Sequence, residues 1–485
     1  MKSKEIFFPK GTADSLLNLF FKSYSIYENE SNKLIAVNDE TKIWCFLEER
    51  KKVKKILRNL YYQETLSTVS DYTINTVYET ISSFETNDKI VTIDLLYNTK
   101  KFLIYNIKGS KKYVRVSAGN VKICEKSKSK YLFKEYDNKS VFIPQKSIKY
   151  NYFSAVSKLF PNTDRSQRIL LSVYLVSLFI KNISHPIFVI SGEYGAGKST
   201  ALRMMSKIIE PTCENISTLP SKVDDVAVII NSGYYACFDN ISNISREVAD
   251  LLCIAATGGI YQKRALYTDS SVSSLDVKRP IALNGINLEI EYNDMIDRCI
   301  ILNFKRISET SRKSEEELWR EFYSCLPKLQ FSIFSIIARA MEKVEDVEIT
   351  SPSRLVDFTK WGYAIAEAIS EGMGDEFLRE LKINSKRSER VAIESNPFLL
   401  TLEDFMAKNN YWSGSATELL KNLKEKYYRT NTTNTLPNSF PKAANVLSRR
   451  LNSLQTSLKS IGLQVEITKS AQRTITIKKT DTEVM

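Results

Sequence analysis

The sequence has little of the side chains that most metal and redox sites need. It contains a single histidine, His185, in 485 residues, and its seven cysteines are scattered without a Cys-X-X-Cys pair. Histidine-based catalysis and histidine-rich metal sites are therefore effectively excluded, and neither a disulfide framework nor a zinc ribbon is expected. Because His185 directly precedes a proline and an apolar run, we expect it to be structural.

Long apolar runs are also missing. The longest, residues 169–180, is interrupted by serines and is too short to cross a bilayer, so it predicts a buried helix. Residues 1–11 show no apolar segment typical of a secretory signal. We therefore expect a protein of the reducing cytoplasm without membrane contact, large enough for about three domains.

Positive charge is unevenly distributed along the chain. The net charge of +13 divides into +10 for residues 1–150, −3 for residues 151–395 and +6 for residues 396–485. Basic ends around a slightly acidic middle predict a polyanionic partner, most simply nucleic acid, and solubility is the alternative explanation.

A glycine-rich segment has the full spacing of a phosphate-binding loop, with a predicted strand before it and a predicted helix after it, which argues against a chance glycine turn. Backbone N–H groups of such a loop, and the positive end of the helix, suit a triphosphate. Lys198 is expected to reach the outer phosphates and Ser199 to bind Mg²⁺. The predicted nucleotide-binding residues are Gly192, Glu193, Tyr194, Gly195, Ala196, Gly197, Lys198, Ser199 and Thr200.

Polar residues follow the next predicted strands in the order that a nucleotide hydrolase needs. Asp239 ends one apolar run and is predicted to hold Mg²⁺ together with Ser199. Asn284 ends another, where it either orients the attacking water or forms a simple turn with the next glycine. Arg298 is placed to act as an arginine finger on a neighbouring subunit, or it pairs with Asp294 or Asp297.

The pattern of apolar runs predicts an α/β protein. Between residues 151 and 382, strand candidates alternate with helices, which favours a mostly parallel sheet covered by helices. The predicted segments are a helical N-terminal region at 1–85, a basic β-rich subdomain at 86–150, an ATPase domain with a helical lid at 151–382, a linker at 383–397 and a winged helix at 398–485.

The basic β-rich subdomain leaves two interpretations open. Residues 111–149 contain eleven Lys or Arg, interleaved with aromatic residues. Such a mixture binds single strands by charge and stacking, but the aromatic side chains would equally fill the core of a small β domain. The residues concerned are Tyr113, Tyr131, Phe133, Tyr136 and Phe142.

Between about residues 160 and 370 the sequence contains the strings GEYGAGKST, FDNIS, RPIALNGI, DMIDRCIILNF and RLVDFTKWGYAIAEAI. Together they resemble the AAA+ ATPases, and more closely the MCM-like replicative helicases and replication initiators of staphylococcal mobile genetic islands and related phage ATPases. The resemblance implies an AAA+ P-loop core with a helical lid, a mixed α+β N-terminal domain and a C-terminal winged helix.

The resemblance also implies roles for particular residues. Such proteins form hexameric rings, so Arg298 would act in trans, and Arg354 matches a second sensor arginine. A β-hairpin, expected at Gln262–Asp269 and Leu275–Arg279 with its tip at Ser270–Ser274, would line a central channel. The predicted DNA-binding residues are Lys263, Arg264, Lys278 and Arg279 near the hairpin, and Arg449, Arg450, Lys469 and Arg473 in the winged helix.

One position departs from the wider AAA+ pattern. Asn240 follows Asp239 where many AAA+ proteins carry a catalytic glutamate, so the general base is unassigned and Glu193 is the candidate. The sequence thus predicts an ATP- and Mg²⁺-dependent DNA helicase and replication initiator of a mobile element, acting as a hexamer on single- and double-stranded DNA. The alternatives are an origin-melting initiator or loader that does not translocate, and a non-unwinding, ATP-dependent scaffold.

Overall fold

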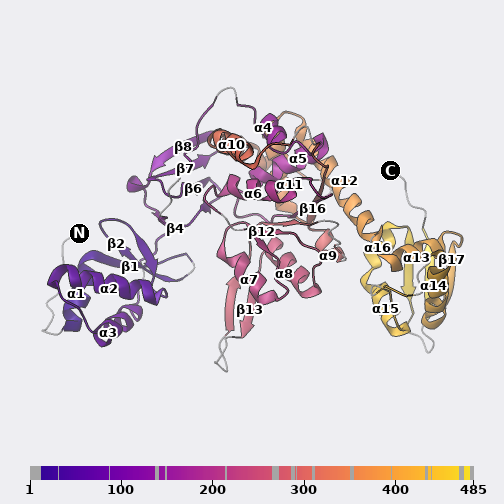
Figure 1. Ribbon diagram of the computed structural model, residues 1–485, viewed down its shortest axis with the longest axis horizontal. Helices are drawn as coiled ribbons and strands as arrows, with labels where there is room; N and C mark the ends of the chain where they lie inside the picture. Colours follow the sequence, from indigo (N-terminus) through magenta and orange to yellow (C-terminus); the bar gives the residue numbers. More distant parts are fainter. Residues whose placement is uncertain are drawn as a thin grey trace. The chain divides into compact units, whose positions relative to one another are not determined.

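The computed structural model describes residues 12–480, apart from 31, 87, 137–140, 148–149, 214–215, 265–271, 286–289, 291, 309–311, 350–353, 395, 432–434, 438–439 and 469–473. The chain divides into two compact units, Met1–Ile143 and Pro144–Met485 (Figure 1). The division lies a few residues before position 150, where the sequence predicts the β-rich subdomain to end.

The first part of the N-terminal unit combines helices with a small antiparallel sheet. The helices are α1 (Thr12–Ser23), α2 (Arg50–Thr65) and α3 (Asp71–Ser82), and the strands in spatial order are β1 (Tyr24–Glu28), β2 (Leu34–Asn38) and β3 (Trp44–Phe46). The prediction of a helical region at 1–85 is therefore wrong for these strands. Runs of three to five residues contain too few periods to distinguish a strand from a helix.

The second part of the N-terminal unit is β-rich, as predicted. A four-stranded antiparallel sheet has the order β5 (Leu96–Asn98), β6 (Phe102–Asn106), β7 (Lys112–Ser117) and β8 (Asn120–Glu125), while β4 (Thr92–Ile93) pairs in parallel with β9 (Leu132–Phe133). The strands β4 and β5 belong to different sheets because the chain bends at residues 94–95. Tyr113 and Phe133 are buried in the core, with ring centroids 4.9 Å apart.

The C-terminal unit begins with α4 (Tyr152–Leu159) and is organised around a five-stranded parallel sheet. Its spatial order is β11 (Ile216–Thr218), β12 (Ala236–Asp239), β15 (Ile281–Asn284), β10 (Ile187–Gly192) and β16 (Cys299–Phe304). All four pairings are parallel, which confirms the predicted parallel sheet. The strand β11 has a weak sequence pattern, because it is a short edge strand whose side chains are partly exposed.

Helices cover both faces of this sheet (Figure 1). On one face, Val189, Phe238 and Leu283 pack in a core with α7 (Val223–Ser232) and α8 (Arg246–Thr257). On the other, Phe188 stacks on Tyr174 of α5 (Arg165–Ser177), with ring centroids 4.3 Å apart. The α5 helix is buried from Ile169 to Ser177, which confirms the buried helix predicted there.

Three long helices follow the sheet: α10 (Glu315–Lys343), α11 (Val356–Ile369) and α12 (Met373–Glu394). The linker predicted at 383–397 is wrong in its first part, because α12 continues through residues 383–394. The Asn384 side chain holds the helix to β16 by accepting from the Ile301 N–H (3.1 Å) and donating to the Ile301 carbonyl (2.7 Å). The charged residues that suggested a linker are mostly the exposed side of this helix. None of the helices in the described ranges is long and apolar enough to cross a membrane.

The last part of the chain has its own core. It contains α13 (Pro397–Met406), α14 (Ala416–Thr430), α15 (Ala444–Ser453) and α16 (Gln455–Ser460), with an antiparallel sheet in the order β17 (Tyr411–Ser415), β19 (Thr474–Lys479) and β18 (Leu463–Ile467). The helical stretch at Ala444–Ser460 is divided into α15 and α16 near Leu454. The strand β17 is hard to recognise in the sequence because two serines and a glycine weaken its strand pattern.

His185 is structural, as expected. Its ring is buried, its Nε2 lies 2.9 Å from the Ser177 carbonyl oxygen, and its backbone N–H donates to the Ala256 carbonyl. Burial lowers the pKa of the imidazole to about 4, with the positive charge of Lys278 adding to the effect. The folded protein therefore holds this side chain neutral.

We predict that the buried, neutral His185 makes the free energy of unfolding decrease at acidic pH. Between pH 6.5 and pH 4, His185 is protonated in the unfolded chain but stays neutral in the folded protein. The free energy of unfolding therefore falls by up to about 3 kcal/mol as the pH drops through this range. Urea unfolding at pH 7, 6 and 5 should show a smaller decrease for His185→Gln than for the natural protein. Equal decreases for the two proteins would contradict this role.

Candidate active site

The loop between β10 and α6 (Lys198–Ile209) can only be built with glycine at key positions. Gly192, Gly195 and Gly197 have positive φ angles of 140°, 79° and 71°. A Cβ atom on Gly192 would lie 2.4 Å from the carbonyl oxygen of Phe304 in the neighbouring strand β16. The left-handed backbone and this close approach together exclude larger residues and fix where the loop leaves the sheet.

Lys198 lies across the base of this loop. Its ammonium group donates to the carbonyl oxygens of Gly192 (2.9 Å) and Glu193 (2.8 Å), and the residue is only 8% exposed. Burial lowers the pKa of Lys198, and the nearby Asp239 carboxylate opposes that shift. The charge is thus positioned at the N-terminus of α6, where the helix dipole also favours an anion.

Three side chains from different elements meet at the carboxyl edge of the sheet. Ser199 Oγ donates to Asp239 Oδ1 (3.0 Å), and Asn284 Nδ2 donates to the same oxygen (2.5 Å) and to Ser199 Oγ (3.3 Å). The Asn240 N–H is a further donor to that oxygen (2.8 Å), from a residue with a φ angle of 56°. Ser199, Asp239 and Asn284 are therefore brought together as their positions in the sequence predict.

These oxygens suit a hard divalent cation. Magnesium is bound in proteins by one or two carboxylates or hydroxyls together with substrate phosphates and water. No three His, Cys, Asp or Glu side chains form a self-contained metal cluster within the described ranges. Ser199 and Asp239 would thus hold a metal ion only together with ligand oxygens.

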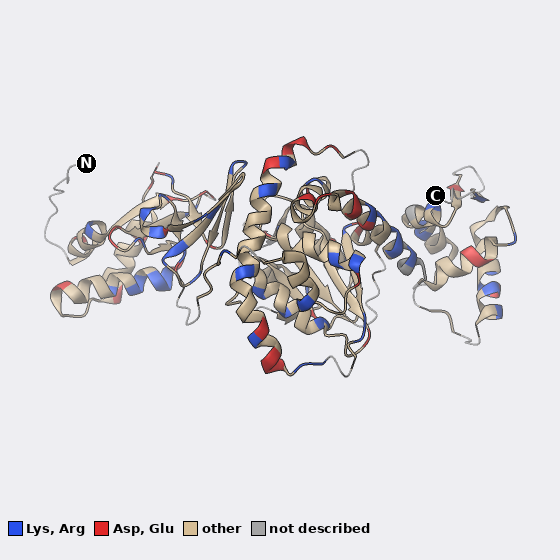
Figure 2. Ribbon diagram, turned by 90° about the horizontal axis from the view of Figure 1, so that it is seen from above, with Lys and Arg blue, Asp and Glu red and all other residues tan. Residues whose placement is uncertain are grey.

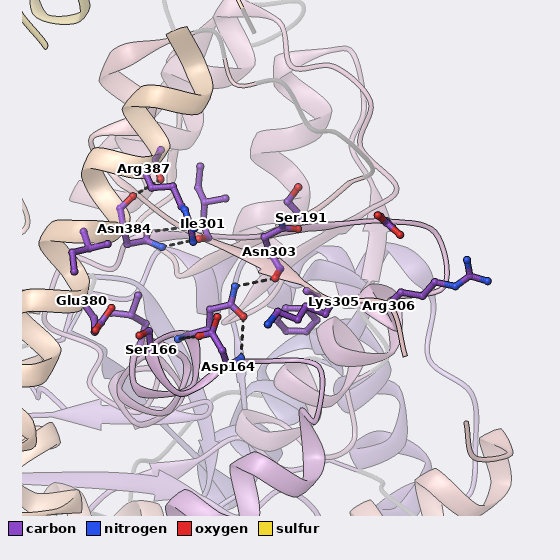
Figure 3. A pocket seen from close by; sticks show the side chains of 16 residues that line it. Asp164, Ser166, Ser191, Ile301, Asn303, Lys305, Arg306, Glu380, Asn384 and Arg387 are labelled. Carbon is purple, nitrogen blue, oxygen red and sulfur yellow. Dashed lines mark hydrogen bonds between the residues drawn. The ribbon is translucent and has the colours of Figure 1, made fainter. Parts of the chain in front are cut away.

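Two cavities open on either side of the phosphate loop. The smaller, about 260 Å³, is lined by residues 194–200 together with Asp239, Asn240 and Asn284. The larger, about 1040 Å³, lies between the start of α5, the ends of β10 and β16, and α12 (Figure 3). Glu193 lines the larger cavity and is not among the residues lining the smaller. The candidate general base and Asp239 therefore line different cavities.

Sequence reasoning missed the polar residues around the larger cavity. Asp164 and Gln167 form a capping box at the start of α5, and Gln167 also donates to the Asn303 carbonyl (2.9 Å), as Figure 3 shows. Arg387 of α12 lines the opposite wall. The capping box could be recognised in the sequence as the start of a helix. The residues of α12 that line the cavity could not, because most of them fall in the segment predicted as a linker.

The two predicted arginines lie apart from both cavities and share a carboxylate. Arg298 Nη1 and Arg354 Nη1 each lie 2.5 Å from Asp294 Oδ1, at α9 (Asn293–Ile296), and Arg354 Nη2 lies 3.3 Å from Asp297. The hydrogen bond from Arg298 lowers the pKa of Asp294, and Arg354 adds to the effect. Within a single chain, therefore, Arg298 pairs with Asp294, the alternative that the sequence left open.

The predicted hairpin is present with different limits. It consists of β13 (Ile260–Arg264) and β14 (Val272–Asp276), so the second strand begins three residues before the predicted Leu275 and includes part of the predicted tip. The residues between the strands, and the side chains of Lys263 and Arg264, lie outside the described residues.

The other predicted DNA-binding residues differ in their exposure. Arg279 is engaged in the fold, since it donates to the Gly233 and Lys278 carbonyl oxygens and pairs with Asp276. Lys278 is half-buried, Arg449 of α15 is exposed and Arg450 is half-buried. Lys469 and Arg473 lie outside the described residues.

Comparison with known families assigns the chain to one of them. The model for the actinomycete integrative conjugative element replication protein RepA matches residues 158–377, and the model for the C-terminal domain of the same protein matches residues 398–484. Together they cover more than half of the chain. The chain belongs to this family of replication proteins. Mobile-element replication is thus supported, although the matching family is actinomycete and not the staphylococcal one suggested by the resemblance.

Similarity to individual proteins is low. Two solved apo structures of the NrS-1 C-terminal region are each 12% identical and cover 96% of this chain, with TM-scores of 0.41 and 0.40 and coverage of 98% and 99% of those chains. This likeness carries no inference about function. No curated protein matches the chain.

We predict that Gly192→Ala damages the loop more than the same substitution elsewhere. The strained backbone should lower the free energy of unfolding by about 1–3 kcal/mol. The contact with the Phe304 carbonyl should add to this loss and displace the loop. Gly372→Ala is the control, because Gly372 also has a positive φ of 76° but a Cβ there would meet nothing within 4 Å. Equal destabilisation of the two variants, measured by urea unfolding, would show that the close approach is unimportant.

Proposed function

We propose that this replication protein is a ring-forming, ATP- and Mg²⁺-dependent DNA helicase and replication initiator with an AAA+ core. The observation that carries the proposal is the meeting of Ser199, Asp239 and Asn284 within hydrogen-bond distance beside the Lys198 loop. A hydroxyl and a carboxylate for the metal, an amide for the attacking water and an ammonium for the phosphates are what phosphoryl transfer needs in one place.

Four side chains of the smaller cavity then have a chemical task. Lys198 exchanges its two carbonyl partners for phosphate oxygens, and the loop N–H groups bind the same phosphates. Ser199 and Asp239 hold Mg²⁺, which when bound neutralises charge on the outer phosphates. Asn284, buried to 2% exposure, is rigidly placed to orient a water molecule. The nucleoside would enter the larger cavity, which begins at Ser191 and Glu193 of the same loop.

The sheet order supports the AAA+ assignment. β15, which carries Asn284, is inserted between the phosphate-loop strand β10 and the Asp239 strand β12, so all three ends reach one site. The helices α10 and α11 follow the sheet in the chain and would form the helical lid. In this proposal Arg298 and Arg354 would exchange the Asp294 carboxylate for the γ-phosphate of a neighbouring subunit.

The C-terminal domain supports DNA binding. Its helices and three-stranded sheet have the order of a winged helix, with Arg449 exposed on α15. A helix of this kind binds in the major groove of an origin. The hairpin β13–β14 would contact the single strand during translocation. If the protein instead melts an origin without translocating, it should fail to displace a strand from forked substrates carrying 3′ or 5′ tails.

Removal of the Lys198 ammonium should abolish ATP turnover and unwinding. We expect a fall of about 10²–10³ in kcat for Lys198→Ala, because the lost group stabilises charge that develops on the phosphates. Lys207→Ala on the same helix is the control, since Lys207 donates to the Cys213 carbonyl and lies outside the smaller cavity. Steady-state phosphate release would measure both, and normal turnover by Lys198→Ala would overturn the proposal.

Replacement of Arg298 should lower ATP turnover without weakening nucleotide binding. We expect Arg298→Ala to lower kcat by about 10³-fold, as an arginine finger does, while binding a fluorescent ATP analogue normally. Arg203→Ala is the control, because Arg203 is a similarly ion-paired arginine, with Glu315 at 3.0 Å. Unchanged turnover by Arg298→Ala would contradict the proposal that Arg298 acts on the γ-phosphate of a neighbouring subunit.

A further inference from the structure

One face of the four-stranded sheet in the N-terminal unit carries exposed cations beside partly buried aromatic residues. Its register places Tyr97 opposite Ile104, Ile104 opposite Arg115, and Arg115 opposite Lys122. Directly paired residues share a face in an antiparallel sheet. These residues therefore form one row across the sheet, ending in two adjacent cations.

An aromatic layer lies along this row. The rings of Tyr97, Phe102 and Tyr131 contact one another with centroids 5.7–6.4 Å apart, and Ile104 beneath them is completely buried. The three aromatic residues themselves are only half-buried, whereas Tyr113 and Phe133 further along the sheet are buried. Of the five aromatic residues named in the sequence, Tyr113 and Phe133 fill the core, while Tyr131 packs against that core together with Tyr97 and Phe102 and is only partly buried.

Cations lie beside the aromatic rings on this face. Arg115 lies 4.6 Å from the centre of the Phe102 ring, and Lys130 lies 5.5 Å from that of Tyr131. In the described part of the chain, neither Arg115 nor Lys122 has a carboxylate within ion-pair distance, and both side chains are exposed. The Glu30 side chain bonds the Tyr97 hydroxyl, at the end of the row away from Lys122.

The pairing of Arg115 with Lys122 is costly unless an anion binds. Like charges directly opposite each other destabilise a sheet. On the opposite face of the same two strands a cation lies opposite an acidic residue, since Lys112 is paired with Glu125 at 3.9 Å. Figure 2 shows further Lys and Arg residues along these strands. A polyanion would relieve the repulsion on the aromatic face.

We infer that this face binds single-stranded DNA, with bases stacked on Tyr97, Phe102 and Tyr131 and phosphates at Arg115, Lys122 and Lys130. Base stacking on aromatic rings needs unpaired bases, whose flat surfaces a duplex keeps covered. An acidic protein partner would use the cations but not the exposed rings. This site is separate from the ATPase site and from the C-terminal domain.

Fluorescence anisotropy with labelled (dT)20 and the full-length protein, without nucleotide, tests the inference. We expect Arg115→Gln/Lys122→Gln to weaken binding about tenfold and to reduce the slope of log affinity against log salt by about 1.4, for two phosphate contacts. The thermal midpoint of this variant should stay the same or rise, because the repulsion is removed. Tyr131→Leu, which keeps the apolar cover of Ile104, should weaken binding about five- to tenfold by loss of stacking.

The matched control is Lys51→Gln/Lys55→Gln, which removes two exposed charges from α2 in the same unit. We expect its affinity and salt slope to be unchanged, and basal ATP turnover to be unchanged in all three variants. Equal losses in the control and in the Arg115/Lys122 variant would overturn the inference, as would duplex binding with the same dependence on Tyr131.

Crosslinking locates the site independently of affinity. Irradiation of the full-length protein with (dT)20 containing 4-thiothymidine, followed by mass spectrometry, should give crosslinks at Tyr97, Phe102 or Tyr131. Crosslinks confined to residues after 143 would overturn the inference and leave the proposed helicase function standing.

Discussion

The site depends on the parallel pairing of β10 between β15 and β16. This pairing places Ile190 opposite Asn284 and Gly192 opposite Phe304, so the phosphate loop leaves the sheet beside both strand ends. The Gly192 position has no room for a side chain because the Phe304 carbonyl is too close. Shifting the register by one residue would point Asn284 to the other face of the sheet and separate it from Asp239 and Ser199.

Charges around the site are balanced internally in the isolated chain. Backbone carbonyls hold Lys198, three donors converge on one oxygen of Asp239, and Asp294 holds both Arg298 and Arg354. In the proposed function, phosphate oxygens would replace the carbonyl partners of Lys198, and the γ-phosphate of a neighbouring subunit would replace Asp294 as the partner of Arg298 and Arg354. The N-terminal sheet differs, because Arg115 and Lys122 face each other there and neither has a carboxylate within ion-pair distance among the described residues.

The parts that could be predicted from the sequence are those with strong local patterns. Apolar runs ending in Asp239 and Asn284 predicted strands, and parallel strands bring their ends to one edge, so the meeting of these side chains followed. Short strands such as β3 and β17 and the continuation of α12 could not be predicted, because few residues or a charged exposed face hide their periodicity. The pairing of Arg354 with Asp294 depends on residues 60 positions apart, which no local pattern reports.

Mixing two variants that are each expected to be inactive tests the proposed shared ATPase site most directly. Lys198→Ala supplies an intact Arg298 and Arg298→Ala an intact Lys198, so a ring formed from equal amounts contains some complete sites between neighbours. With random assembly, steady-state ATP turnover should recover to about one quarter of that of the natural protein, because one site in four combines both intact residues. A mixture as inactive as either variant alone, although both bind nucleotide and assemble together, would contradict the account.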